Sequence, residues 1–157
     1  VVFSISNAVA QSAQPIISYN YGAHLTERIS RTLRVSLFTA IVCGLSVMVC
    51  LWLGATGIVR LFLDPQENAY GLAVEGLPLF AMCAVFFAVN IAFIGYYQSI
   101  EKAMVSTVYT LLRGIFFLVP CFILLPCLIG VPGLWLAIPA AELLTCIVIS
   151  VRYVRRE

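Results

Sequence analysis

Charge is scarce in this chain, and that scarcity decides the class of protein. Only 10% of its 157 residues are charged, whereas 62% are hydrophobic, and the mean hydropathy is +1.06. A soluble domain of this size leaves about a third of its surface in water, so it has no room to bury so many apolar side chains. The composition therefore excludes a soluble enzyme and predicts an integral membrane protein. A net charge of only +2 also excludes nucleic acid as a partner.

Metal-ligating and catalytic residue types are equally sparse. The sequence has one histidine, His24, and six cysteines that form no CxxC pair. A metal site needs several converging ligands, whereas these cysteines are scattered through apolar runs and pack as small hydrophobic side chains. No Ser–Lys or His–Glu constellation is present, and the acids are separated by whole apolar runs. We therefore expect no metal, no cofactor and no enzymatic reaction.

Long apolar runs are what the chain has instead. A membrane-spanning helix needs about 20 apolar residues, and charge-free windows predict five such segments, at residues 1–19, 35–60, 72–97, 105–129 and 132–151. The chain opens inside the first segment without Met, so we expect a piece of a longer protein. Short joints and the lack of period-2 strands predict the fold class: an all-α, polytopic membrane helical bundle.

The basic residues predict how the bundle is oriented. Arginine and lysine favour the cytoplasmic side of a membrane. Two joints and the tail carry seven of them, whereas the other joints carry Asp64 and Glu67, with Arg60 just before them; the seven are Arg28, Arg31, Arg34, Lys102, Arg152, Arg155 and Arg156. This asymmetry predicts a multi-pass protein of the cytoplasmic membrane, with its carboxyl end in the cytoplasm.

The joint at residues 21–34 has a helical pattern of its own. Leu25, Ile29 and Leu33 recur every fourth position between charged residues. The pattern predicts a short amphipathic helix that lies on the cytoplasmic leaflet. A solvated connector with positive-inside charge is the alternative, and the sequence leaves both open.

Two sets of residues inside the spans are candidate cavity-lining groups. The first set, here called the polar stripe, follows one face of residues 1–19 and comprises Ser4, Asn7, Gln11, Gln14 and Ser18. Because lipid makes polar groups costly, we expect Asn7, Gln11 and Gln14 to face a water-filled cavity, with hydrogen-bonded helix packing as the alternative. The second set lies on residues 72–97 and comprises Met82, Phe86, Asn90 and Phe93. These residues could line a binding site for hydrophobic cations, although packing between helices gives the same pattern.

Two charges lie deep in the apolar spans. Arg113 is nine residues beyond Met104, and Glu142 is ten residues before Arg152. At about 1.5 Å per residue both lie roughly 14–15 Å from the cytoplasmic end, so antiparallel neighbours bring them level. The sequence thus predicts an intramembrane charge pair. The alternative is that Arg113 snorkels to the interface and leaves Glu142 protonated or available for ion coupling.

Four motifs in order along the chain resemble a known family. They are QPIISYNYGA (14–23), YYQSIEKA (96–103), LLRG (111–114) and GVPGLWLAIPAAELLT (130–145). Together they are similar to the bacterial branch of the multidrug and toxic compound extrusion (MATE) transporters. The resemblance implies a twelve-helix parent of two six-helix lobes around a central cavity. This chain then corresponds to the end of the eighth helix through the twelfth, about four and a half helices of the carboxyl-terminal lobe.

The resemblance also implies a function and partners. Members of this family export hydrophobic cations by alternating access, driven by a Na⁺ or H⁺ gradient, so the expected partners are the missing amino-terminal lobe, the lipid bilayer and small hydrophobic cations. Two departures stand out. Glu101 takes the place of a motif glycine, and Asn90 stands midway down a helix where some members carry an ion-coupling acid. The second departure argues against an ion site in this lobe.

Two other classes of function remain as alternatives. A lipid-linked oligosaccharide flippase has a related helical architecture, but it needs several basic residues to hold phosphate, and only Arg113 lies inside a span. A membrane scaffold without transport leaves the polar stripe unexplained.

Overall fold

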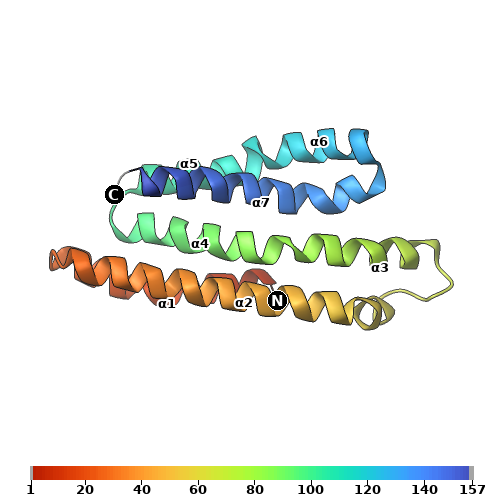
Figure 1. Cartoon of the computed structure of the whole chain (residues 1–157), viewed down its shortest axis with the longest axis horizontal. Helices are drawn as coiled ribbons and strands as arrows, with labels where there is room; N and C mark the ends of the chain where they lie inside the picture. Colours follow the sequence, from red (N-terminus) through yellow and green to blue (C-terminus); the bar gives the residue numbers. More distant parts are fainter. Residues whose placement is uncertain (1, 156–157) are drawn as a thin grey trace.

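The structure, a computed structural model, describes residues 2–155 and shows a bundle of long helices joined by short turns (Figure 1). Within those residues there is no strand. The elements are α1 (Val2–Gly22), α2 (Thr26–Arg60), α3 (Asn68–Ala81), α4 (Cys83–Ser99), α5 (Ala103–Leu111), the π-helix η1 (Leu112–Phe116), α6 (Leu118–Ile129) and α7 (Val131–Val154).

Four stretches of the described chain are long and apolar enough to cross a membrane. They are Thr26–Arg60, Ala69–Ser99, Ala103–Ile129 and Val131–Val154. Each contains one of the last four predicted spans, and the fold class, an all-α membrane helical bundle, is confirmed. The helix α1 covers the first predicted span but is not among the four. It carries no charge, but its serine, asparagine and glutamine residues lower its hydropathy.

The joint at residues 21–34 is not a separate helix on the membrane surface. The helix α1 ends at Gly22, His24 adopts a left-handed φ of 58°, and α2 then runs unbroken for 35 residues. Ile29 and Leu33 are buried in the largest apolar core of the bundle. The sequence pattern did not reveal this packing, because an apolar stripe that packs on protein has the same period as one that packs on lipid.

Two of the spans are interrupted helices. The third predicted span is α3 followed by α4, with a break at Met82. In the fourth, η1 separates α5 from α6, and the Phe117 N–H donates to the Leu112 carbonyl at 2.8 Å, a bond five residues long. Pro120 explains the wider turn, since it has no N–H and its ring would clash with the Phe116 carbonyl in a regular helix. Arg113 lies within this π-turn.

The helix α4 lies at the centre of the bundle. It packs against α1, α2, α5 and α7, whereas α6 packs against α7 and η1 (Figure 1). Glycines allow the tightest crossings: a Cβ on Gly44 of α2 would lie 2.8 Å from the Val85 Cα, and one on Gly133 would lie 2.4 Å from the Leu125 carbonyl. Close approach of this kind is typical of helix pairs in membranes, where small residues replace a hydrophobic driving force.

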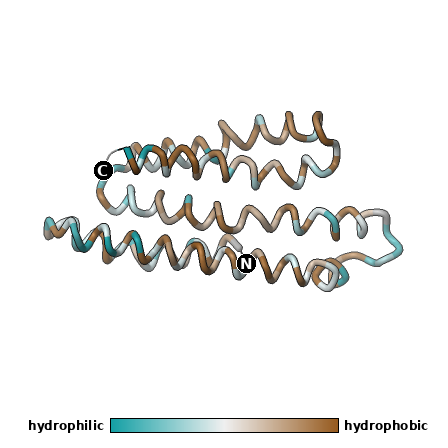
Figure 2. Tube along the Cα trace, viewed as in Figure 1, coloured by the Kyte–Doolittle hydropathy of each residue, from teal (hydrophilic) through white to brown (hydrophobic). Residues whose placement is uncertain are grey.

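The turns gather at the two ends of the bundle. The α1–α2 turn, the α4–α5 turn and the end of α7 lie at one end, and the other two turns lie at the opposite end (Figure 1). Hydrophilic residues lie at the first end, along the first half of α2, and in the α2–α3 turn at the opposite end (Figure 2). Glu101, in the α4–α5 turn, has a left-handed φ of 61°, so the motif glycine that it replaces stood where glycine is the favoured residue.

Candidate intramembrane site

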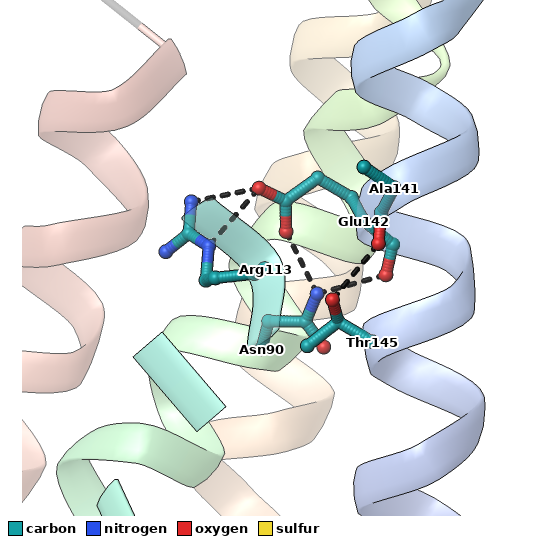
Figure 3. A network of polar contacts seen from close by, with 5 residues as sticks. All are labelled: Asn90, Arg113, Ala141, Glu142 and Thr145. Atoms are coloured by element: carbon teal, nitrogen blue, oxygen red, sulfur yellow. Dashed lines mark hydrogen bonds and ion pairs between the residues drawn. The ribbon is translucent and has the colours of Figure 1, made fainter. Parts of the chain in front are cut away.

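An ion pair joins η1 to α7 at the middle of the bundle. The Arg113 Nη2 lies 2.7 Å from the Glu142 Oε1, and Nε donates to the same oxygen at 3.1 Å (Figure 3). The two side chains are 16% and 6% exposed. The sequence predicted that these charges would lie level on antiparallel helices, and the structure brings them into direct contact.

Asn90 of α4 closes the other side of the Glu142 carboxylate. Its Nδ2 donates to the Glu142 Oε2 at 2.7 Å and to the Glu142 backbone carbonyl at 2.9 Å. Asn90 is 0% exposed, and its Oδ1 has no partner among the described residues. Two acceptors fix the amide orientation, because only the nitrogen can donate to both. The Asn90–Arg113–Glu142 network therefore ties together α4, η1 and α7.

A cavity of about 230 Å³ opens beside this network. Arg113, Glu142 and Thr110 supply its polar groups, and Phe3, Leu118 and Ile138 supply most of its apolar wall. The Arg113 guanidinium carbon lies 4.3 Å from the centre of the Phe87 ring, within range of a cation–π interaction. The Arg113 guanidinium thus contacts the Glu142 carboxylate on one side and the Phe87 ring on another.

The predicted substrate wall is not continuous in the structure. Asn90 is enclosed in the network, and Phe93 is 5% exposed, with its ring packed 5.4 Å from that of Tyr153. For these two residues the structure favours the packing alternative, since α4 is the central helix and buries that part of its surface. Met82 is exposed and Phe86 is half-buried, so only this half of the wall stays open to a ligand.

The polar stripe of α1 lies at the surface of the described chain. Gln11 is exposed, and Asn7 and Gln14 are half-buried. The Gln14 amide donates to the Gln98 Oε1 of α4 at 3.2 Å, which shows that this end of the stripe also takes part in helix packing. Ser6, one residue from Asn7, is 4% exposed and marks the face on which α1 packs.

Sequence reasoning missed two residues around the network, Phe87 and Thr110, and a third residue, buried and polar, elsewhere in the lobe. Phe87 lies three residues before Asn90, so helical spacing put both on one face, and an aromatic residue there was the available clue. Thr110 likewise precedes Arg113 by three residues. The third residue, Tyr109, lies in the largest apolar core; it is 1% exposed, and its hydroxyl has no hydrogen-bond partner among the described residues. Nothing in its sequence context marks it.

The described residues contain no group of three or more histidine, cysteine or acidic side chains that could hold a metal ion. Both oxygens of Glu142 are already engaged by Arg113 and Asn90. The chemistry that remains at the site is hydrogen bonding by the guanidinium and by nearby polar groups.

Apolar helices that surround a buried polar network and a cavity are the construction of a polytopic membrane transport protein. The comparisons with known proteins lead to the same class. The family model MatE matches residues 1–123, and the chain belongs to this family of multidrug transporters. No match was found among curated protein sequences.

Solved structures of this family share the fold of the chain. The MATE multidrug transporter DinF-BH, solved as a complex, is 28% identical with a TM-score of 0.87, and the match covers 98% of this chain and 34% of that one. An outward-facing MATE transporter of the MOP superfamily is 18% identical with a TM-score of 0.85, and the match covers 94% of this chain and 33% of that one. An inward-facing transporter of the same family is 17% identical with a TM-score of 0.87, and the match covers 99% of this chain and 38% of that one. The chain therefore spans about a third of the length of these structures.

Proposed function

We propose that this chain is the larger part of the carboxyl-terminal lobe of an antiporter, and that the complete protein exports hydrophobic cationic compounds. In this proposal the two lobes enclose a central cavity and open it alternately to the two sides of the membrane. A gradient of Na⁺ or H⁺ drives the cycle, and the amino-terminal lobe belongs to the part of the protein outside this chain.

The observation that carries the proposal is the equal fit of one helix arrangement to two transport states. The fold matches an inward-facing relative at a TM-score of 0.87 and an outward-facing relative at 0.85. Alternating access by rocking of lobes requires each lobe to keep its internal packing while it moves. The buried network of Asn90, Arg113 and Glu142 supports such rigidity, because it joins three elements of the lobe.

The residues at the surface of the lobe also support the proposal, because they offer groups that could contact a solute. The polar stripe of α1 offers amide groups to water or to a solute, and Met82 and Phe86 offer an adaptable sulfur and an aromatic face on α4. The location of the arginines supports a cytoplasmic-membrane protein whose carboxyl end lies in the cytoplasm. Most of the basic residues belong to the start of α2, the α4–α5 turn and the end of α7, and these segments lie at one end of the bundle (Figure 1).

Transport in proteoliposomes tests this proposal. The full-length protein is reconstituted, loaded with a rhodamine dye or ethidium, and given a Na⁺ gradient or a pH gradient in separate experiments. We expect one of the two gradients to drive dye movement, and its collapse by an ionophore to stop it. Protein-free liposomes under the same gradients are the control. If neither gradient moves any cation while a lipid-linked oligosaccharide crosses the bilayer, the protein is a flippase and the proposal is wrong.

A further inference from the structure

The outer side of Arg113 is unused by the network. Nε and Nη2 both donate to one oxygen of Glu142, whereas the third guanidinium nitrogen, Nη1, points away from Glu142 (Figure 3). No hydrogen bond joins Nη1 to any residue in the described range 2–155. Arginine has five N–H donors, so the guanidinium keeps donors for a group that the lobe itself does not supply.

The negative end of the pair is closed. The two carboxylate oxygens of Glu142 are taken by Arg113 and by the Asn90 amide, and Glu142 is 5% exposed. Arg113 and Glu142 both line the cavity of about 230 Å³, but of the two only Arg113 keeps donors that no described residue uses. Although the pair is neutral as a whole, it therefore presents its donor face to the cavity. A hydrogen-bond acceptor is attracted there, and a second cation is not.

The rest of the cavity suits a flat apolar group. Phe3, Leu118 and Ile138 line it, and Thr110 commits its hydroxyl proton to the Ser106 carbonyl. An engineered apolar cavity of about 150 Å³ already holds a benzene ring. A cavity of about 230 Å³ therefore has room for an aromatic ring that carries a carboxyl group.

We propose that this cavity is a subsite for the carboxylate or carbonyl group of an amphipathic substrate, bound by the outward N–H donors of Arg113. The inference rests on the proposed function and narrows its substrate class. Substrates that combine a cationic part with an aromatic carboxylate use the subsite, whereas simple lipophilic cations do not. The guanidinium is charged in either case, but a free carboxylate also brings a charged acceptor and can accept two N–H bonds, so it binds more tightly than an ester, whose carbonyl is neutral.

Two dyes that differ by one carboxyl group test the subsite. Rhodamine B carries a carboxylate on its pendant ring, and tetraethylrosamine has the same ring system without it. Their dissociation constants are measured by fluorescence anisotropy with the purified full-length transporter. The quantity compared among variants is the affinity ratio, rhodamine B over tetraethylrosamine.

The main variant is Gly114→Leu, which adds a side chain at the wall of the cavity and leaves both residues of the ion pair unsubstituted. A Cβ at Gly114 meets no atom within 4 Å, and the same holds for Gly57 on α2, so Gly57→Leu is the matched control. Arg113→Lys is the second variant, because lysine keeps a charge near Glu142 but loses the outward donors. We expect the affinity ratio to fall at least tenfold in both variants and to stay at the wild-type value in Gly57→Leu.

Three results would overturn the subsite or its premise. An unchanged ratio in folded Gly114→Leu protein, with tetraethylrosamine still exported along a gradient, shows that the subsite is wrong while the proposed function stands. Failure of the wild type to bind either dye contradicts the proposed function itself. A cysteine at Thr110 that resists a maleimide reagent in dye-free protein shows that another part of the transporter fills the cavity. We expect this cysteine to react, and rhodamine B to protect it.

Discussion

Two sets of intramembrane polar residues in this lobe have opposite surroundings. The polar stripe on α1 lies at the surface of the described chain, where Gln11 is exposed and Asn7 is half-buried. The network of Asn90, Arg113 and Glu142 is buried, and each member bonds to another over 2.7–3.1 Å. Both sets are costly against lipid, and the charged pair more so than the neutral amides and hydroxyls of the stripe. The difference shows that the cost of a polar side chain in lipid does not by itself reveal its role. The role depends on whether its hydrogen-bond partners belong to neighbouring helices or to a solute.

The largest effect is expected from breaking the ion pair. Arg113→Ala leaves the Glu142 carboxylate buried without its cation, and Glu142→Ala leaves the guanidinium unpaired. Loss of one partner of a buried pair costs about 3–5 kcal/mol. We expect each variant to yield several times less folded protein than the wild type, as measured by size-exclusion chromatography in detergent. Wild-type yields from both variants would show that the network is not a structural lock.

The aromatic residues of α4 give a contrast on a single helix. Phe93 is 5% exposed, whereas Phe86 is half-buried. Truncation of a buried phenylalanine costs about 3–5 kcal/mol, so Phe93→Ala should lower the amount of folded protein. Phe86→Ala should instead shift the resistance profile between drugs at normal membrane levels. An equal loss of resistance to every drug, tracking expression, would assign Phe86 to packing as well.

Removal of the Asn90 amide should have an intermediate effect. Asn90→Leu fills a similar volume but leaves the Glu142 Oε2 without its donor, and an unpaired buried polar group costs about 1–3 kcal/mol. We expect a lower thermal midpoint with the fold retained. Ser99 is the matched control on the same helix, because its hydroxyl bonds to the Gly95 carbonyl within α4. Ser99→Ala should therefore change the midpoint less than Asn90→Leu.

The smallest effect on stability is expected in the polar stripe, where substitution should change accessibility rather than folding. In a full-length background without native cysteines, Asn7→Cys and Gln11→Cys should react with a membrane-impermeant thiol reagent. Exposed substitutions usually stay within about 0.5 kcal/mol of the parent. Ser6→Cys, one position away but 4% exposed, is the control and should stay unlabelled. Protection at all three positions would mean that the stripe is a packing surface.

Sequence reasoning went furthest where one physical rule acts alone. Hydrophobic run length predicted four of the membrane-crossing segments, and helix rise placed Arg113 opposite Glu142. It failed where several rules give the same pattern. The period of Leu25, Ile29 and Leu33 fits a leaflet helix as well as the packed start of α2. The spacing of Asn90 and Phe93 fits a cavity wall as well as a core, and only the tertiary packing of α4 separates the two.

The central claim is that Arg113 and Glu142 stabilise the lobe as a pair, and a double-mutant cycle tests it most directly. The unfolding free energies of wild type, Arg113→Ala, Glu142→Ala and the double variant are measured in detergent. We predict a coupling of about 2–3 kcal/mol, in the range of contacting residues, and partial recovery in the swap Arg113→Glu with Glu142→Arg. A coupling near zero, together with a stable Glu142→Gln variant that has lost gradient-driven efflux, would contradict this account and place Glu142 in the transport mechanism.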